Sequence, residues 1–86
     1  MKIEKKVWSK WFDKILSKKK TFEVRLADWK CKPGDILVLR EWNPKTKKYT
    51  GRKVSRKVTY VMKIKDLKCF SKKDIEKYGL QIISIK

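Results

Sequence analysis

A chain of 86 residues can build one small hydrophobic core, and its four Trp, three Tyr and three Phe supply large side chains for that core, which argues against a disordered protein. The formal net charge is +17, because 26 lysines and arginines stand against nine acidic residues. Nucleic acid is the first partner to expect and an anionic membrane surface the second; the less favoured alternative is that lysine enrichment reflects solubility, a thermophilic lifestyle or genome composition.

The sequence also disfavours several kinds of protein and site. No stretch approaches the roughly 18 apolar residues of a membrane span, and the amino terminus lacks the apolar segment of a signal peptide, so we expect a cytoplasmic protein. Histidine is absent, and Cys31 and Cys69 stand alone, so we expect no metal and no other cofactor. A disulfide between these cysteines would be unusual inside a cell but stays open, and we favour a monomer.

The first predicted elements are a strand at residues 2–7 and an amphipathic helix. Ser9 can cap the helix, and the lysines at 18–20 lie where the negative end of its dipole would be. The apolar residues of the helix recur at helical spacing and define one face: Trp8, Trp11, Phe12, Ile15 and Leu16.

Three further strands are predicted in the middle of the chain. Residues 21–26 alternate between apolar and polar, which is typical of a half-buried strand, and 36–39 form an apolar run typical of a central strand. Residues 54–64 alternate again and should form a hairpin with 36–39. Arg56 interrupts their apolar face, so we expect either a bulge that rotates it outward or an interior polar site, with the bulge favoured.

The carboxyl-terminal part predicts a short helix and a last strand. Ser71 and Asp74 resemble a capping box, Gly79 ends the helix, and residues 81–85 return as a strand. The whole chain, 1–86, then reads as one α+β domain with a mainly antiparallel, partly closed β-barrel. Besides the helix face, we expect the strand residues of this barrel to be mainly buried: Phe22, Val24, Ile36, Val38, Val58 and Tyr60.

The segment 11–25 resembles the signature of ASCH domains, a helix followed by G-x-K-x-x-E-x-R. Lys20, Glu23 and Arg25 occupy the lysine, glutamate and arginine of that signature, whereas Lys18 stands where the family usually has glycine. The similarity continues through residues 32–39, 49–52 and 58–61, and so covers nearly the whole chain.

This resemblance implies a PUA-like barrel with a cleft beside the first helix, and a role linked to RNA. It also implies a possible reaction, because some ASCH relatives deacetylate N4-acetylcytidine with a lysine that matches Lys20 and a threonine that matches Glu23. A carboxylate cannot simply replace that hydroxyl nucleophile, so we expect no deacetylation here.

The candidate ligand-binding residues fall into two groups. In the signature, Arg25 would contact an anion or base edge, and Glu23 would accept from an exocyclic amine; as an alternative, the two form an ordinary surface ion pair. Elsewhere, two tryptophans beside charged residues could stack on bases. Three arginines could contact phosphate or guanine, or could equally be solvated residues at strand ends. The full set of predicted binding residues is Lys20, Glu23, Arg25, Trp29, Arg40, Trp42, Arg52 and Arg56.

Three functions remain open from the sequence. We favour an RNA- or nucleotide-binding module over an enzyme, because the absence of histidine removes the usual general base. The first alternative is a small hydrolase, an amidohydrolase or a ribonuclease, working through Lys20, Glu23, Thr21, Tyr60 or a supplied metal. The second alternative is an adaptor whose basic surface docks an acidic protein.

Overall fold

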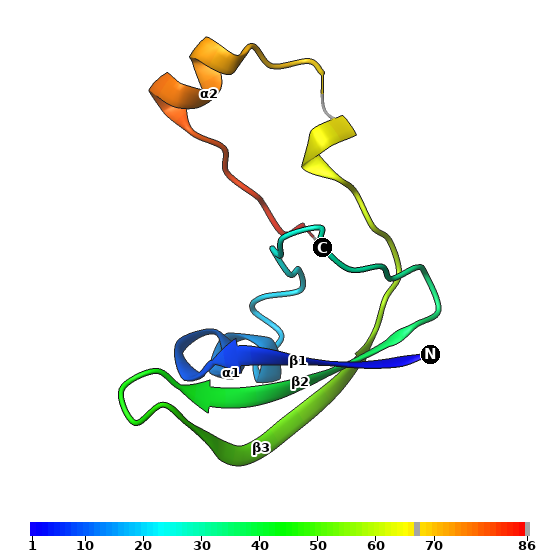
Figure 1. Cartoon of the computed structure of the whole chain (residues 1–86), viewed down its shortest axis with the longest axis vertical. Helices are drawn as coiled ribbons and strands as arrows, with labels where there is room; N and C mark the ends of the chain where they lie inside the picture. The colour runs from blue at the N-terminus through cyan, green and yellow to red at the C-terminus, as the bar shows by residue number, and fades with distance from the viewer. Residues whose placement is uncertain (67, 86) are drawn as a thin grey trace.

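The computed structural model describes residues 1–66 and 68–85. Three strands, two α-helices and one 3-10 turn are found within them (Figure 1). In chain order these elements are β1 (Lys2–Trp8), α1 (Ser9–Leu16), β2 (Ile36–Asn43), β3 (Lys48–Lys57), η1 (Ile64–Asp66) and α2 (Lys72–Tyr78).

The three strands form one open sheet in the order β1-β2-β3. β1 runs parallel to β2, because the chain passes through α1 and a long loop before it returns, whereas β2 and β3 form an antiparallel hairpin. The predicted hairpin and the central place of residues 36–39 are therefore confirmed.

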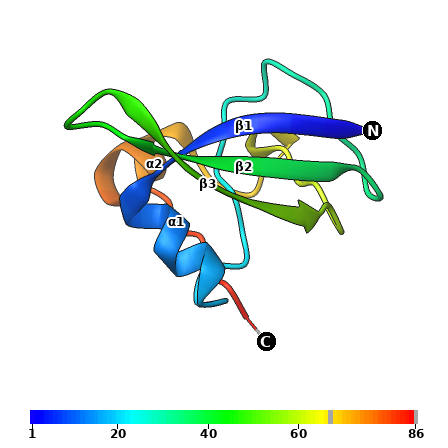
Figure 2. The same ribbon diagram turned by 90° about the horizontal axis from the view of Figure 1, so that it is seen from below.

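The hydrophobic core lies between α1 and one face of the sheet (Figure 2). Phe12 and Ile15 of α1 are 1% and 4% exposed and pack on Val7 of β1 and Leu39 of β2. The other apolar residues of the predicted helix face, Trp8, Trp11 and Leu16, are largely exposed. A sheet of three strands is too narrow to cover the whole apolar face of the helix, so the residues at the edges of that face stay exposed.

The predicted mainly antiparallel, partly closed PUA-like barrel is wrong. Strand pairing in the described chain is mixed, and the sheet does not close. Residues 21–26 and 81–85, which would have closed it, are not strands. The 21–26 segment is held by side-chain contacts instead, since the Lys20 ammonium donates to the carbonyl oxygen of Phe22 and to Glu23, both at 2.7 Å.

The long strand predicted at 54–64 stops at Lys57 for a local reason. β2 begins at Ile36, whose partner is Lys57, and Val58 still exchanges hydrogen bonds with Gly34 and Asp35. The next partner along the chain would be Pro33, which has no N–H to donate. Beyond Val58, β3 therefore lacks a backbone donor on the opposite segment with which to continue the hydrogen-bond ladder.

The predicted burial of the strand residues is only partly right. Val58 is buried, and Phe22, Ile36 and Val38 are half-buried. Val24 and Tyr60 are 60% and 75% exposed, since the strands that would have enclosed them do not form.

Arg56 sits in regular pairing with Leu37, so the favoured bulge at this position is wrong. Its side chain is not an interior group either, because it is exposed and donates to the carbonyl oxygen of Ser55. The irregularity of the hairpin lies instead between Arg40 and Trp42, opposite Gly51.

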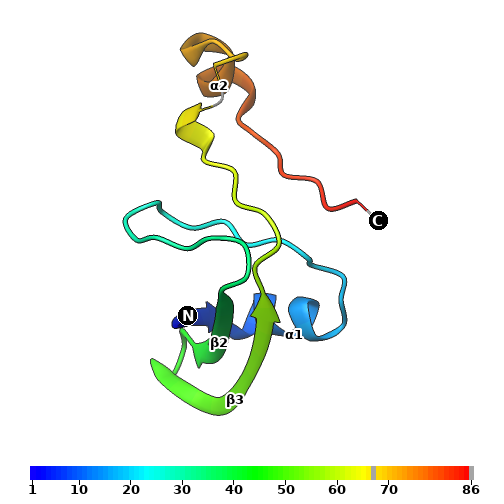
Figure 3. The ribbon, with the colours of Figure 1, turned by 90° about the vertical axis from the view of Figure 1, so that its right-hand side faces the viewer.

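The carboxyl-terminal helix has the predicted cap. The Ser71 hydroxyl accepts from the Asp74 backbone N–H at 3.1 Å, and Gly79 ends α2 with a φ of 72°. Figures 1 and 3 show α2 standing away from the sheet. The Thr21 and Ser84 hydroxyls are hydrogen-bonded, which places the end of the chain beside the loop after α1.

Candidate functional site

The predicted lysine, glutamate and arginine of the 20–25 segment meet in one cluster. The Lys20 ammonium donates to Glu23 Oε1 at 2.7 Å, and Arg25 Nε donates to Glu23 Oε2 at 2.8 Å. Their side chains are 15%, 19% and 29% exposed in the order Lys20, Glu23, Arg25, so the cluster is partly shielded from water. One carboxylate thus holds two cations in fixed positions.

The end of α1 positions this cluster. Lys18 has a φ of 62°, in the left-handed region that glycine adopts most easily. The backbone N–H groups of Lys19 and Lys20 both donate to the Lys14 carbonyl at 3.0 Å. The turn is therefore tight despite the lysine, and it points Lys20 back toward Glu23.

The cluster lines an open cleft of about 760 Å³ beside α1. Three aromatic side chains, Trp8, Trp11 and Phe22, also line the cleft. Its basic residues are Lys6, Lys14, Lys19, Lys20 and Arg25. Aromatic surface beside several cations and one carboxylate suits a ligand that has both a flat ring and an anionic group.

The remaining predicted binding residues lie outside this cleft. Trp29 lies under the ammonium of Lys5, which is 4.0 Å from the ring centre. Arg40 and Trp42 lie on the sheet face opposite α1, and Arg56 is an exposed residue of β3. The structure thus brings three of the eight predicted residues together in the cleft.

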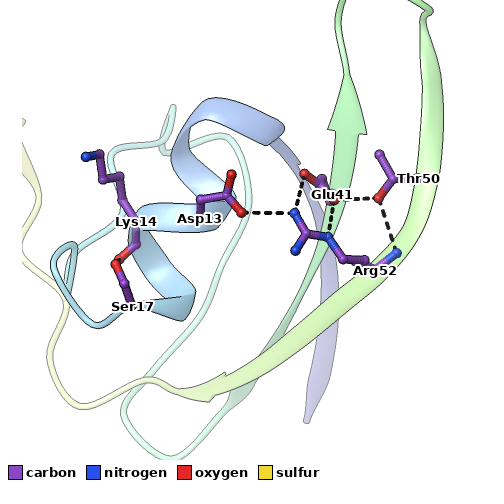
Figure 4. A network of polar contacts seen from close by, with 6 residues as sticks. All are labelled: Asp13, Lys14, Ser17, Glu41, Thr50 and Arg52. Atoms are coloured by element: carbon purple, nitrogen blue, oxygen red, sulfur yellow. Dashed lines mark hydrogen bonds and ion pairs between the residues drawn. The ribbon is translucent and has the colours of Figure 1, made fainter.

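The eighth residue, Arg52, holds the sheet and helix together (Figure 4). Its Nε and Nη2 donate to the two oxygens of Glu41 at 2.7 and 3.0 Å, and Nη2 also reaches Asp13 Oδ1 of α1 at 2.9 Å. The Thr50 hydroxyl donates to Glu41 Oε1 at 2.6 Å. These partners satisfy the buried Glu41, which is 3% exposed.

Gly51 explains how Thr50 and Arg52 both reach Glu41. The hairpin register shifts between Arg40 and Trp42, and Gly51 has a φ of 95° opposite this shift. A bulge of this kind turns the strand so that side chains are re-aimed.

Two carboxylates have strongly lowered pKa values. The Arg52 guanidinium, more than any other group, lowers the pKa of Glu41 to about 2 against the cost of burial. The pKa of Asp35 is lowered to about 2, first by the backbone N–H of Lys32 and then by its ammonium. Both carboxylates therefore stay ionised near neutral pH and serve as structural acceptors.

The sequence interpretation missed several of these residues. Trp8 and Trp11 were assigned to the core because their spacing is helical, yet they line the cleft. Glu41 was overlooked, although it continues the inward parity of Leu37 and Leu39 along β2. A charged residue at an inward position was the available signal.

Other kinds of site are absent from the described residues. Among the side chains that the structure describes, those of residues 1–65 and 68–85, no group of three or more Cys, Asp or Glu could hold a metal ion. Cys31 is half-buried, Cys69 is exposed, and both are free thiols. No helix in these two ranges is long and apolar enough to cross a bilayer.

The chain is similar in sequence to a phage protein and to one protein family. An uncharacterized 12.9 kDa protein in the GpA 3′ region of Escherichia phage P2 is 40% identical over 63 residues. The match covers 73% of this chain and 56% of the phage protein, so the chain spans little more than half of that relative's length. No solved structure matches significantly. A family described as a domain of unknown function, DUF3850, matches residues 3–74, and the chain therefore belongs to this family.

Proposed function

We propose that this protein is a cytoplasmic RNA- or nucleotide-binding module that takes one nucleotide into the cleft beside α1. The observation that carries the proposal is the Lys20–Glu23–Arg25 cluster within an aromatic, basic cleft of about 760 Å³. The net charge of +17 supports an anionic ligand, and the resemblance of segment 11–25 to ASCH domains supports RNA.

The cluster divides the work between its three side chains. Glu23 uses one oxygen for Lys20 and the other for Arg25, so both cations are held before a ligand arrives. Arg25 uses Nε for Glu23, and no described residue accepts from its two terminal nitrogens. These donors suit a phosphate or the acceptor edge of a base, while Trp11 and Phe22 supply surfaces for stacking.

A hydrolase is supported less well by this arrangement. The Lys20 ammonium already donates to Glu23 and to the Phe22 carbonyl, so its hydrogen bonds serve to hold the cluster together. The Thr21 hydroxyl is bonded to Ser84 instead of to Lys20. We therefore propose binding without deacetylation of N4-acetylcytidine.

The test compares two variants in binding to a pool of short RNAs at fixed salt. Arg25→Ala removes a fixed donor and should reduce preference for the favoured nucleotide by about 1 to 3 kcal/mol. Replacing the hairpin lysines Lys45, Lys47 and Lys48 should weaken all sequences alike, because phosphate contacts carry no sequence information. Circular dichroism checks that both variants fold.

Two results would contradict the proposal. If Arg25→Ala lowers all affinities uniformly, the cluster is an ion pair in a generic basic surface. If wild-type protein binds no RNA at low salt, or an acidic protein displaces all RNA while RNA cannot displace it, the adaptor function is the better explanation.

A further inference from the structure

In the part of the chain that the structure describes, α1 is the helix that packs on the sheet, and the opposite sheet face carries both aromatic and basic side chains. α1 packs on the face that holds Val7, Leu39 and Val54. The alternate residues of the strands therefore point away from the helix. The aromatic and basic residues on this open face are Lys2, Lys6, Trp8, Arg40, Trp42, Tyr49, Lys53 and Lys57.

Cations and rings on this face are paired across strands. The Lys6 ammonium of β1 lies 4.2 Å from the centre of the Trp42 ring on β2. The Arg40 guanidinium of β2 lies 4.0 Å from the centre of the Tyr49 ring on β3. Tyr49 is 46% exposed, so a base can reach it or stack on the guanidinium plane beside it.

A hollow of about 330 Å³ extends over all three strands, because it is lined by Glu4 of β1, Arg40 of β2, and Tyr49, Gly51, Arg52 and Lys53 of β3. Glu4 is the carboxylate of this hollow, and it lies 3.6 Å from Arg40. Since five basic residues of the face stand against that single carboxylate, the surface favours a polyanion.

The open face is continuous with the cleft. Lys6 and Trp8 belong to β1, and both also line the cleft beside α1. Trp8 is in register with Trp42, which in turn is paired with Tyr49. The three aromatic residues thus cross the sheet from β1 to β3, over about 10 Å at the usual spacing of neighbouring strands.

We infer that a single-stranded RNA with one nucleotide in the cleft continues over the edge of β1 and across this open face. Successive bases stack on Trp42 and on the Arg40–Tyr49 pair, and Lys53 and Lys57 contact phosphates. Alternating rings and cations suit this ligand, because a base presents a flat surface while its backbone presents a charge. The cleft end of this path rests on the proposed function.

The experiment compares two matched double variants. Tyr49→Ala with Lys53→Ala removes a ring and a cation from the open face. Tyr78→Ala with Lys77→Ala removes the same residue types from α2, where the Lys77 ammonium lies 5.2 Å from the Tyr78 ring centre. Both variants lose one positive charge and one exposed tyrosine, so they differ in location.

Affinities are measured at fixed salt for a mononucleotide and for an RNA of about eight nucleotides, a length within the range that single-stranded-binding folds occupy. The open-face variant should bind the longer RNA at least about tenfold more weakly than the α2 variant. It should bind the mononucleotide as the wild type does. Circular dichroism checks the fold, and photo-cross-linking of 5-bromouridine RNA to wild-type protein should label Trp42 or Tyr49.

The outcomes separate the two proposals. If both double variants weaken the longer RNA equally and no cross-link forms on the sheet, the path across the sheet is overturned while the cleft stands. If the mononucleotide fails to bind the wild type, or binds without regard to Arg25→Ala, the proposed function fails. A longer RNA that still depends on Tyr49 would then bind the sheet alone, and the continuous path would be overturned as well.

Discussion

At the scale of single residues, the clearest division is between arginines that hold the protein together and arginines that are free to bind. Arg52 neutralises the buried Glu41 and links β3 to α1 through Asp13. Arg25 has one nitrogen fixed by Glu23. Arg56 donates only to a neighbouring carbonyl among the described residues. The residue type alone does not predict which of these arginines has a carboxylate partner.

The first prediction compares two arginines of β3. Arg52→Ala should lower the free energy of unfolding more than any change of an unpaired surface arginine, because it leaves the buried Glu41 carboxylate without its charged partner. Arg56→Ala, an equal change in charge at an exposed site, should cost less than about 0.5 kcal/mol. Urea unfolding measures both, and equal losses would mean that Glu41 does not depend on Arg52.

The second prediction concerns pH. The folded-state pKa of Glu41, about 2, lies below its ordinary value of 4.5. Its contribution to stability is therefore fully present above about pH 5 and is lost as the pH falls toward 2. Glu41→Gln cannot lose a charge, so the difference in unfolding free energy between wild type and variant should shrink from pH 6 to pH 3. A constant difference across this range would contradict the assigned pKa.

At the scale of elements, α1 serves two purposes on two sides. Phe12 and Ile15 face the sheet, whereas Trp11 is 43% exposed and lines the cleft. The same apolar periodicity produces both, since a three-stranded sheet cannot cover the whole stripe. The exposed flank is what makes the helix a wall of the cleft that we propose as the binding site.

The third prediction follows from these two sides. Phe12→Ala should lower the free energy of unfolding by about 3 to 5 kcal/mol, because it empties the middle of a small core. Trp11→Ala should cost less than about 1 kcal/mol and should weaken nucleotide binding, since its ring lies in the cleft. The pair is measured by thermal unfolding and by nucleotide titration. Comparable stability losses would show that Trp11 belongs to the core.

Some helices and strands of this fold could be predicted from the sequence, and others could not. α1, α2 and the hairpin were predictable, because helical spacing, the Ser71 cap and local antiparallel pairing are encoded within short segments. The strand predicted at 21–26 was not confirmed. Alternation shows that a segment is compatible with a sheet, but a strand also needs a neighbouring strand to pair with, and the described sheet holds only β1, β2 and β3.

The candidate site was predictable to a similar degree. The signature spacing indicated Lys20, Glu23 and Arg25, and the structure places them in hydrogen-bonding contact. The aromatic walls were not predictable, because Trp8 and Trp11 have the spacing of core residues. Whether such residues are covered depends on the width of the sheet on which the helix packs. The spacing of residues within the helix does not predict that width.

At the scale of the whole molecule, charge dominates. A net charge of +17 is carried by a molecule measuring 42 × 31 × 28 Å. At about 10 mM salt the screening length is about 30 Å, so positive groups repel one another across the entire fold. At about 150 mM it falls to about 8 Å, and repulsion is confined to near neighbours. The unfolded chain spreads the same charge over a larger volume, so salt should favour the folded state.

The fourth prediction is that added salt acts in opposite directions on stability and on binding. Between about 10 and 150 mM sodium chloride the melting temperature should rise by about 4 to 8 °C for each kcal/mol of repulsion that is screened. Over a similar range RNA affinity should fall steeply, with a log-log slope near −0.7 for each phosphate neutralised in a single strand. The Arg52–Glu41 pair is screened less than an ion pair between two exposed groups, because Glu41 is buried although Arg52 is 52% exposed, so it should not reverse the stability trend. Calorimetry of the free protein and RNA titrations at the same salt concentrations test both trends. A melting temperature that falls with salt would mean that attractive surface pairs outweigh the repulsion, and a flat binding slope would remove phosphate contacts from the account of this surface.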